Sequence, residues 1–185
     1  VTISLSKSVF DVWIENIMSF QSRLPKPEVP QDGQESVWEY PRPPIVRASN
    51  VSVKVQLAGI VIAESNKSVQ VLETSHPPTY YLPPDDVDQS YFTKIDRSSF
   101  CEWKGNAIYW DVSVNKSEVR AGAWSYDQPT SAFKQIAGYF SFYPASFECS
   151  IDNKLVMPQP GQFYGGWVTE DVVGPFKGAT GSQWW

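Results

Sequence analysis

The sequence predicts a mainly β protein made of compact, antiparallel coiled sheets or a partly open barrel, with a tent-like (β-tent) packing of the sheets as a further option. The first observation is alternation: the apolar residues of 51–57 are separated by polar ones, the period of a half-buried strand. The second is turn chemistry, as in Asn115-Lys116-Ser117 and Asp152-Asn153-Lys154. The third is repetition, because short strand-like runs follow one another at 60–63, 69–73, 80–82, 107–114, 118–126, 139–143, 147–151 and 155–156.

The segments between these strands also have recognisable chemistry. Residues 35–44 are rich in proline, which favours an extended segment that wraps a sheet or forms the wall of a pocket. Pro77-Pro78 interrupts a strand pattern that resumes at Tyr80. Residues 83–87 predict a turn or the start of a helix, and residues 130–136 predict one short helix.

The N-terminal part differs from the rest of the chain. Residues 8–20 predict an amphipathic helix, with Ser8 placed to cap its first turn. We expect this helix to dock on the main domain, and a dimer contact or an interfacial anchor is the alternative. A proline-rich linker follows, so we expect residues 1–34 to be helix and linker. Residues 35–185 then form a single β-rich domain that ends in a glycine- and aromatic-rich strap.

Charge and composition exclude several classes of protein. The net charge is −5 and the pI is about 4.9, which argues against a nucleic-acid partner. No run of 18 apolar residues is present, so we expect no membrane partner. Cys101 and Cys149 do not make a disulfide framework, and we expect two reduced thiols in a cytoplasmic protein. With one histidine and two cysteines, the chain is short of ligands for a structural zinc site, so we expect no metal and no cofactor.

Three separated runs concentrate side chains that do chemistry: 72–81, 100–105 and 123–126. The only histidine and one of the two cysteines fall in these runs. A fold has no structural need for so many such groups close together, whereas a binding pocket does. The aromatic content of 15%, with eight Trp, also indicates that some rings line a cavity. The rings that could stack a planar ligand, with core packing as the alternative for each, are Trp103, Tyr109, Trp110, Trp124, Tyr126 and Trp167.

Several longer motifs resemble one known family. They are VWEYPRPP (37–44), LETSHPPTYYLPPDDV (72–87), FCEWKGNAIYW (100–110), AWSYDQP (123–129), GYFSFYP (138–144) and FYGGWVTEDVVGPFKG (163–178). In this order the motifs resemble a bacterial family described as domain of unknown function 427, sometimes labelled nucleotidyltransferase-like. The resemblance implies a compact, mainly antiparallel fold of coiled sheets and little about activity.

The nucleotidyltransferase label has little support in the residues. That chemistry usually needs a Gly-Ser turn followed by paired carboxylates that hold metal ions. Asp86-Val87-Asp88 has the carboxylate spacing but no preceding Gly-Ser, and we expect solvated loop carboxylates there. A P-loop, a dinucleotide glycine fingerprint and a Ser-His-Asp order are also missing from the sequence.

The candidate catalytic residues are Glu73, His76, Glu102 and Lys104. Glu73 shares a strand face with Val71 and is either an acid/base group or a strand-end carboxylate. His76 either transfers protons near neutral pH or is a satisfied histidine that holds the proline turn. If 99–103 is extended, Glu102 and Lys104 share a face, as a catalytic pair or as an exposed salt bridge worth at most about 1 kcal/mol.

The candidate ligand-binding residues are Arg42, Tyr80, Cys101, Trp124 and Tyr126. Arg42 lies between two prolines, which would present its guanidinium rigidly to an anion. In an extended segment Cys101 and Glu102 point to opposite faces, so a single pocket would take both only across a bulge. Cys101 is either a nucleophile activated by a neighbouring cation or an inert buried thiol.

These residues favour a small-molecule-binding protein, in which any catalysis is metal-independent acid/base chemistry. Its proton carriers would be Glu73 or Glu102 together with His76. The alternative is a non-catalytic protein-interaction module that binds through the linker, the predicted N-terminal helix and Trp184-Trp185. A weaker alternative is nucleotidyl or phosphoryl transfer. The expected partner is an unidentified small molecule, and a homodimer remains an open option.

Overall fold

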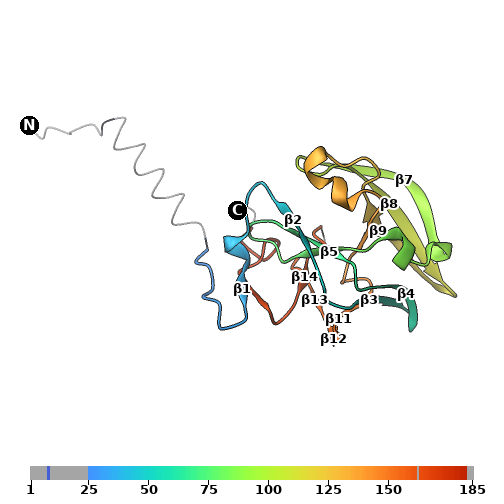
Figure 1. Ribbon diagram of the computed structural model, residues 1–185, viewed down its shortest axis with the longest axis horizontal. Helices are drawn as coiled ribbons and strands as arrows, with labels where there is room; N and C mark the ends of the chain where they lie inside the picture. The colour runs from blue at the N-terminus through green and yellow to red at the C-terminus, as the bar shows by residue number, and fades with distance from the viewer. Residues whose placement is uncertain (1–7, 9–24, 162, 183–185) are drawn as a thin grey trace, which may run out of the picture.

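The computed structural model describes residue 8, residues 25–161 and residues 163–182. Apart from Ser8, the predicted N-terminal helix lies outside the described residues, and so does the Trp184-Trp185 pair. The described part is mainly β (Figure 1). Its helical segments are short 3-10 turns: η1 (Val37–Glu39), η2 (Pro84–Asp86), η3 (Gln89–Tyr91) and η4 (Ser131–Ile136). The predicted helical elements at 83–87 and 130–136 are therefore confirmed as η2 and η4.

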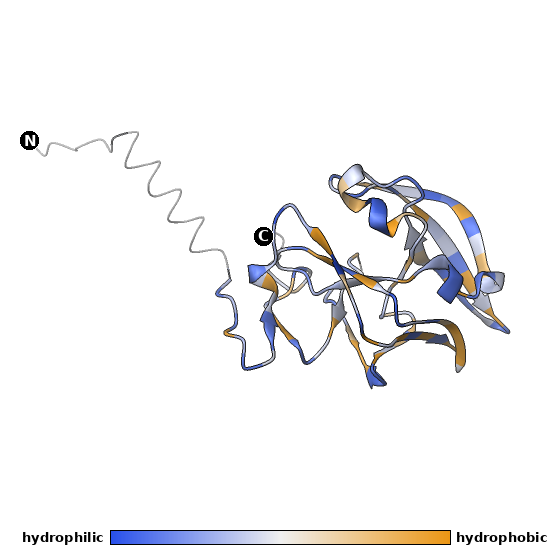
Figure 2. Cartoon of the chain, in the orientation of Figure 1, coloured by the Kyte–Doolittle hydropathy of each residue, from blue (hydrophilic) through white to orange (hydrophobic). Residues whose placement is uncertain are grey.

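The first sheet is an antiparallel meander with the strand order β10-β9-β8-β7. Its strands are β7 (Phe92–Cys101), β8 (Gly105–Val114), β9 (Ser117–Ser125) and β10 (Phe140–Phe142). Polar and apolar residues alternate along the long strands (Figure 2), as expected for strands with one face on a core. The register shifts between Ile95 and Ser98 and between Trp110 and Val112, which bends the sheet.

Two further antiparallel sheets complete the central part of the fold. One has the order β12-β11-β3-β4 and contains β3 (Val53–Leu57), β4 (Ile60–Ser65), β11 (Glu148–Ile151) and β12 (Lys154–Leu155). The other has the order β2-β5-β6 and contains β2 (Ile45–Ala48), β5 (Val69–Leu72) and β6 (Thr79–Tyr81). The alternation seen in 51–57 is confirmed, since Val53 and Val55 are fully buried.

The C-terminal part adds two short pairs. β13 (Met157–Pro158) pairs antiparallel with β14 (Trp167–Val168), and β15 (Val172–Val173) pairs parallel with β1 (Glu35–Ser36). This C-terminal segment, residues 157–161 and 163–182, contacts elements that are distant in sequence through β15 and through the Trp167 N–H, which donates to the Pro78 carbonyl.

The predicted mainly β fold with several antiparallel sheets is confirmed. None of the sheets in the described part of the chain closes into a barrel. The third sheet meets the first through a single bridge between Leu82 and Phe140. Pro83 and Pro84 follow at once, and because proline has no N–H group the ladder cannot continue there.

The described residues form three core clusters, of which the smallest contains Val37, Tyr40, Leu72 and Val172, beside the β1–β15 pair. The largest contains Val53, Ile62, Val112, Phe142 and Trp167 and joins the first two sheets and the C-terminal segment. The second contains Val71, Tyr81, Tyr109, Trp124 and Ile136 and joins the first and third sheets. Among the described residues, no helix is long and apolar enough to cross a membrane.

Candidate functional site

A cavity of about 460 Å³ opens where the first and third sheets and the C-terminal segment meet. All three chemically rich runs contribute to its lining, together with residues 159–177. The polar side chains of the lining include Arg42, Glu73, His76, Lys104, Gln159 and Lys177. Its aromatic side chains include Tyr81, Tyr109, Trp124, Tyr126, Tyr143 and Tyr164.

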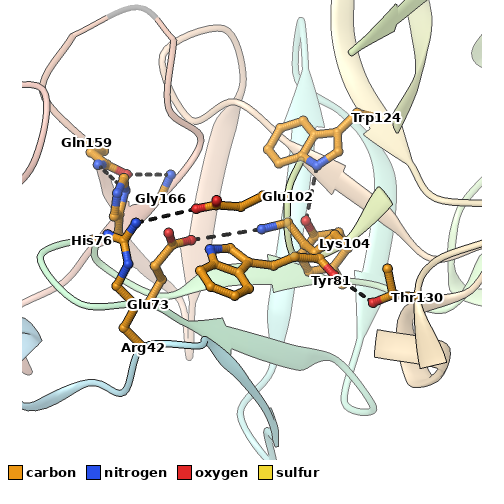
Figure 3. A network of polar contacts seen from close by, with 11 residues as sticks. Arg42, Glu73, His76, Tyr81, Glu102, Lys104, Trp124, Thr130, Gln159 and Gly166 are labelled. Atoms are coloured by element: carbon orange, nitrogen blue, oxygen red, sulfur yellow. Dashed lines mark hydrogen bonds and ion pairs between the residues drawn. The ribbon is translucent and has the colours of Figure 1, made fainter. Parts of the chain in front are cut away.

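Glu73 and Lys104 form a half-buried ion pair in this cavity (Figure 3). Val71 and Glu73 both line the cavity, as expected for alternate residues at the end of β5. Lys104 comes from the turn between β7 and β8, and its Nζ lies 4.0 Å from Glu73 Oε2. The Lys104 side chain is only 12% exposed and that of Glu73 24% exposed. The pair therefore places both charges where water is limited.

His76 lies in the turn between β5 and β6, and Gln159 fixes its tautomer. The Gln159 side-chain oxygen accepts from the Gly166 N–H at 3.1 Å, and its Nε2 donates to the Lys177 carbonyl at 2.8 Å. The same Nε2 lies 2.9 Å from His76 Nδ1. Because an amide nitrogen only donates, Nδ1 is the acceptor and the ring proton lies on Nε2. His76 thus offers an N–H donor.

The ring of His76 is neutral at pH 7. Burial lowers the pKa of His76 to about 4, and the positive charges of Lys104, Lys177 and Arg42 act in the same direction. The sequence predicted a group that titrates near neutral pH or a satisfied structural histidine. The ring does hold the turn through its hydrogen bond to Gln159. Its surroundings disfavour protonation near pH 7, because burial and three cations destabilise the charged form.

Glu102 is a correction to the predicted site. Residues 102–104 form the turn between β7 and β8, so the alternation of an extended strand does not apply. Glu102 lies outside the cavity lining, and its side chain is 64% exposed and accepts from Arg42 Nη2 at 3.4 Å. The expected Glu102–Lys104 pair is wrong, since Lys104 pairs with Glu73 and Glu102 pairs with Arg42 (Figure 3).

Tyr80 is a second correction to the predicted site, because Tyr81 and not Tyr80 lines the cavity. Thr79 and Tyr81 line the cavity, while Tyr80 lies on the other face of β6. Its hydroxyl accepts from Gln70 Nε2 at 2.6 Å, and its ring lies 5.2 Å from that of Trp167 in the core. The strand was recognised, but its phase was misassigned by one residue.

The remaining predicted ligand-binding residues all line the cavity: Arg42, Cys101, Trp124 and Tyr126. Trp124 Nε1 donates to the Tyr81 hydroxyl at 3.2 Å. Burial raises the pKa of Tyr81 and of Tyr126, so both hydroxyls stay protonated. Of the other rings proposed for stacking, Tyr109 lines the cavity, whereas Trp103, Trp110 and Trp167 pack against the core clusters.

The C-terminal segment supplies residues that motif reasoning did not assign to the site: Gln159, Tyr164, Gly165 and Lys177. The available signal was the Gly165-Gly166 pair beside aromatic residues, which permits close backbone approach. A Cβ at Gly165 would collide with the Trp124 ring, and one at Gly166 would collide with the Gln159 side chain. The two glycines thus let this segment pack against the cavity wall.

We expect Gly166→Ala to lower the free energy of unfolding by about 1–3 kcal/mol and to release His76. The added Cβ would lie 2.8 Å from the Pro77 carbonyl oxygen, a backbone atom that cannot rotate away. Displacing Gln159 would also remove the N–H donor that holds His76 Nδ1 unprotonated. Urea unfolding and the imidazole NMR signals check both effects. Gly59→Ala, in a turn with open space, should leave the imidazole signals unchanged, and a change there would contradict this account.

The two cysteines should react at very different rates. Cys101 lines the cavity, whereas Cys149 is buried in β11, where burial raises the pKa of its thiol. Because the thiolate is the reactive form, iodoacetamide should alkylate one thiol per native chain rapidly. Mass spectrometry would assign the label, and Cys101→Ser should abolish the fast phase. Fast labelling of Cys149 instead would show that the core is more accessible than the structure indicates.

The carboxylates at 86 and 88 have local structural roles. Asp86 accepts from the Ser65 hydroxyl at 2.5 Å, and Asp88 caps η3 by accepting from the Ser90 N–H at 3.1 Å. Across residues 25–161 and 163–182, no group of three or more His, Cys, Asp or Glu side chains is arranged to hold a metal ion.

The fold and the site define a mainly β protein whose cavity combines an ion pair, a neutral imidazole and a wall of aromatic side chains. Residues 45–153 match the family described as a domain of unknown function (DUF427), which carries the label NTP_transf_9, and the chain belongs to this family. No curated protein matches the chain. Gln159, Tyr164 and Lys177 lie outside the matched residues, so the site extends beyond them.

Proposed function

We propose that the chain is a small-molecule-binding protein and that its ligand occupies the cavity between the first and third sheets. The observation that carries the proposal is convergence: residues from three separate runs and from the C-terminal segment line one cavity. Its volume of about 460 Å³ falls within the range of sites for small organic ligands. Aromatic walls with a few converging polar groups are also typical of such sites.

The same groups would support metal-independent acid/base chemistry on a carbonyl compound. Glu73 would accept a proton from the carbon next to the carbonyl, and the electron pair of that C–H bond would move onto the carbonyl oxygen. Lys104 and the Nε2–H of His76 would stabilise the negative charge that develops on this oxygen. Return of the proton from Glu73 to the substrate would complete the cycle. In this proposal His76 donates a hydrogen bond, and Glu73 carries the proton.

A thermal-shift screen tests the proposed function. The panel contains carbonyl metabolites and also nucleotides with and without magnesium, because the family label refers to nucleotidyl transfer. A ligand at about a hundred times its Kd adds about 2.7 kcal/mol to the native state, which should raise Tm by roughly 5 °C or more. Glu73→Gln and His76→Gln should reduce that rise.

Glu102→Gln is the matched control, because Glu102 is exposed and outside the cavity lining. It should retain the wild-type rise in Tm. A ligand whose effect survives both cavity variants and disappears in the control would place the binding site elsewhere and contradict the proposal.

A further inference from the structure

The lining of the cavity is rich in positive charge, although the chain as a whole is acidic. Arg42, Lys104 and Lys177 line the cavity, whereas Glu73 is the single acidic side chain among its lining residues in the described part of the chain. The whole chain carries a net charge of −5. Arg42 pairs with Glu102, an exposed residue outside the lining, and the positive charges of Lys104, Lys177 and Arg42 all lower the pKa of His76. The local charge therefore favours an anion.

Two donors in the lining lack a hydrogen-bond acceptor among the described residues. Lys104 Nζ is 4.0 Å from the Glu73 carboxylate, beyond the 2.7–2.9 Å expected of a charged hydrogen bond. His76 uses Nδ1 to accept from Gln159, and no acceptor for its Nε2–H occurs in residues 25–161 or 163–182. Two unsatisfied donors on the wall of one cavity are suited to an anionic oxygen.

The rest of the wall is suited to a planar ring. Tyr81, Trp124 and Tyr126 form a buried aromatic face, and their hydroxyls and indole provide only neutral polar groups. Phe100 and Phe163 also belong to the lining, and they are 75% and 73% exposed. A ligand that covers apolar side chains of this size removes their surface from water, which makes the free energy of binding more favourable.

Building on the proposed small-molecule binding, and not on the acid/base step, we infer that the ligand of this cavity is an aromatic organic anion, with its carboxylate or phosphate at Lys104 and the Nε2–H of His76 and its ring against Trp124 and Tyr126. A neutral ring of the same shape would leave the two donors unsatisfied. An inorganic anion would leave the aromatic face uncovered. Both should bind at least tenfold more weakly than the aromatic anion.

The test compares probes that differ in charge and little in shape: indole-3-acetate with indole-3-acetamide, 4-hydroxybenzoate with 4-hydroxybenzamide, phenyl phosphate, and inorganic phosphate alone. Affinity is measured by calorimetry and by protection of Cys101 from iodoacetamide, a neutral reagent. We expect at least one acid to bind tenfold or more tightly than its amide and to protect Cys101. Phenyl phosphate distinguishes a phosphate preference from a carboxylate preference.

Lys104→Met should remove most of the preference for the acid while the amide still binds. Lys116→Met is the matched control, because Lys116 is exposed in the turn between β8 and β9, outside the cavity lining, and it should change nothing. If Lys104→Met does not fold, the acid–amide comparison on the wild-type chain still decides the inference.

The outcomes separate this inference from the proposed function. Amides that bind as tightly as their acids and protect Cys101 would overturn the preference for an anion and leave a small-molecule site in place. Binding of inorganic phosphate as tight as that of phenyl phosphate would overturn the role of the aromatic face. If no probe, charged or neutral, binds or protects Cys101, the inference fails, and the screen in the preceding section then decides the proposed function.

Discussion

Trp167→Ala is expected to lower the free energy of unfolding by about 3–5 kcal/mol. Trp167 is fully buried in the largest core cluster, although it belongs to the two-residue strand β14. Its indole N–H donates to the Phe142 carbonyl at 3.2 Å, and its ring packs against Tyr80. The alanine variant would leave a cavity and a buried carbonyl without its donor, so both costs apply. Urea unfolding of the two chains measures the difference.

Phe163→Ala is the matched control for this loss. Phe163 is also a large aromatic residue of the C-terminal segment, but its side chain is 73% exposed. Its replacement should change the free energy of unfolding by no more than about 0.5 kcal/mol. Equal losses in the two variants would show that Trp167 is not a core residue.

The expectation that residues 35–185 form one domain predicts a single unfolding transition, in which the changes in fluorescence and in circular dichroism coincide.

The central strands could be predicted because their signals are local. Val53 and Val55 alternate with polar neighbours and are buried in β3, and Asn115-Lys116 is the turn between two long strands. Such patterns follow from the two-residue period of a strand and from turn chemistry, which a single sequence contains.

The pairing of the C-terminal segment could not be predicted in the same way. β1 and β15 each contain two residues, and the partner of Glu35 in the ladder is Val172. Strands of that length have no periodicity, and the contact depends on how the whole chain is arranged. Gln159 and Lys177 reach the site through this segment, and for that reason sequence reasoning missed them.

The errors within the site have equally specific causes. Strand alternation was extended through 102–104, where the chain turns, and so Glu102 and Lys104 were paired with each other instead of with Arg42 and Glu73. In β6 the strand itself was recognised, but nothing local distinguishes the face of Tyr80 from that of Tyr81. The side of a strand that faces a cavity depends on the sheets that pack around it.

The pH dependence of stability should isolate His76, because it is the only histidine of the chain. Its pKa is about 4 in the folded chain, compared with 6.5 for an unperturbed histidine. Between these values the unfolded chain binds a proton that the folded chain does not, so stability falls as the pH falls. We expect this histidine to lower the free energy of unfolding by up to about 2 kcal/mol between pH 7 and pH 5 and to add almost no slope above pH 7.

His76→Gln is the variant that tests this account, because glutamine does not titrate. A difference in overall stability between the variant and the wild type does not affect the test. The quantity compared is the change in the free energy of unfolding between pH 7 and pH 5, measured by urea unfolding at several pH values. The change should nearly disappear in the variant, and the imidazole NMR signals of the wild-type chain should titrate near pH 4. Most carboxylates stay ionised above pH 5 and contribute little in this interval. An unchanged slope in His76→Gln, or imidazole signals that titrate near 6.5, would show that the ring is exposed to water and titrates as an unperturbed imidazole. The hydrogen bond to Gln159 would then not define its tautomer.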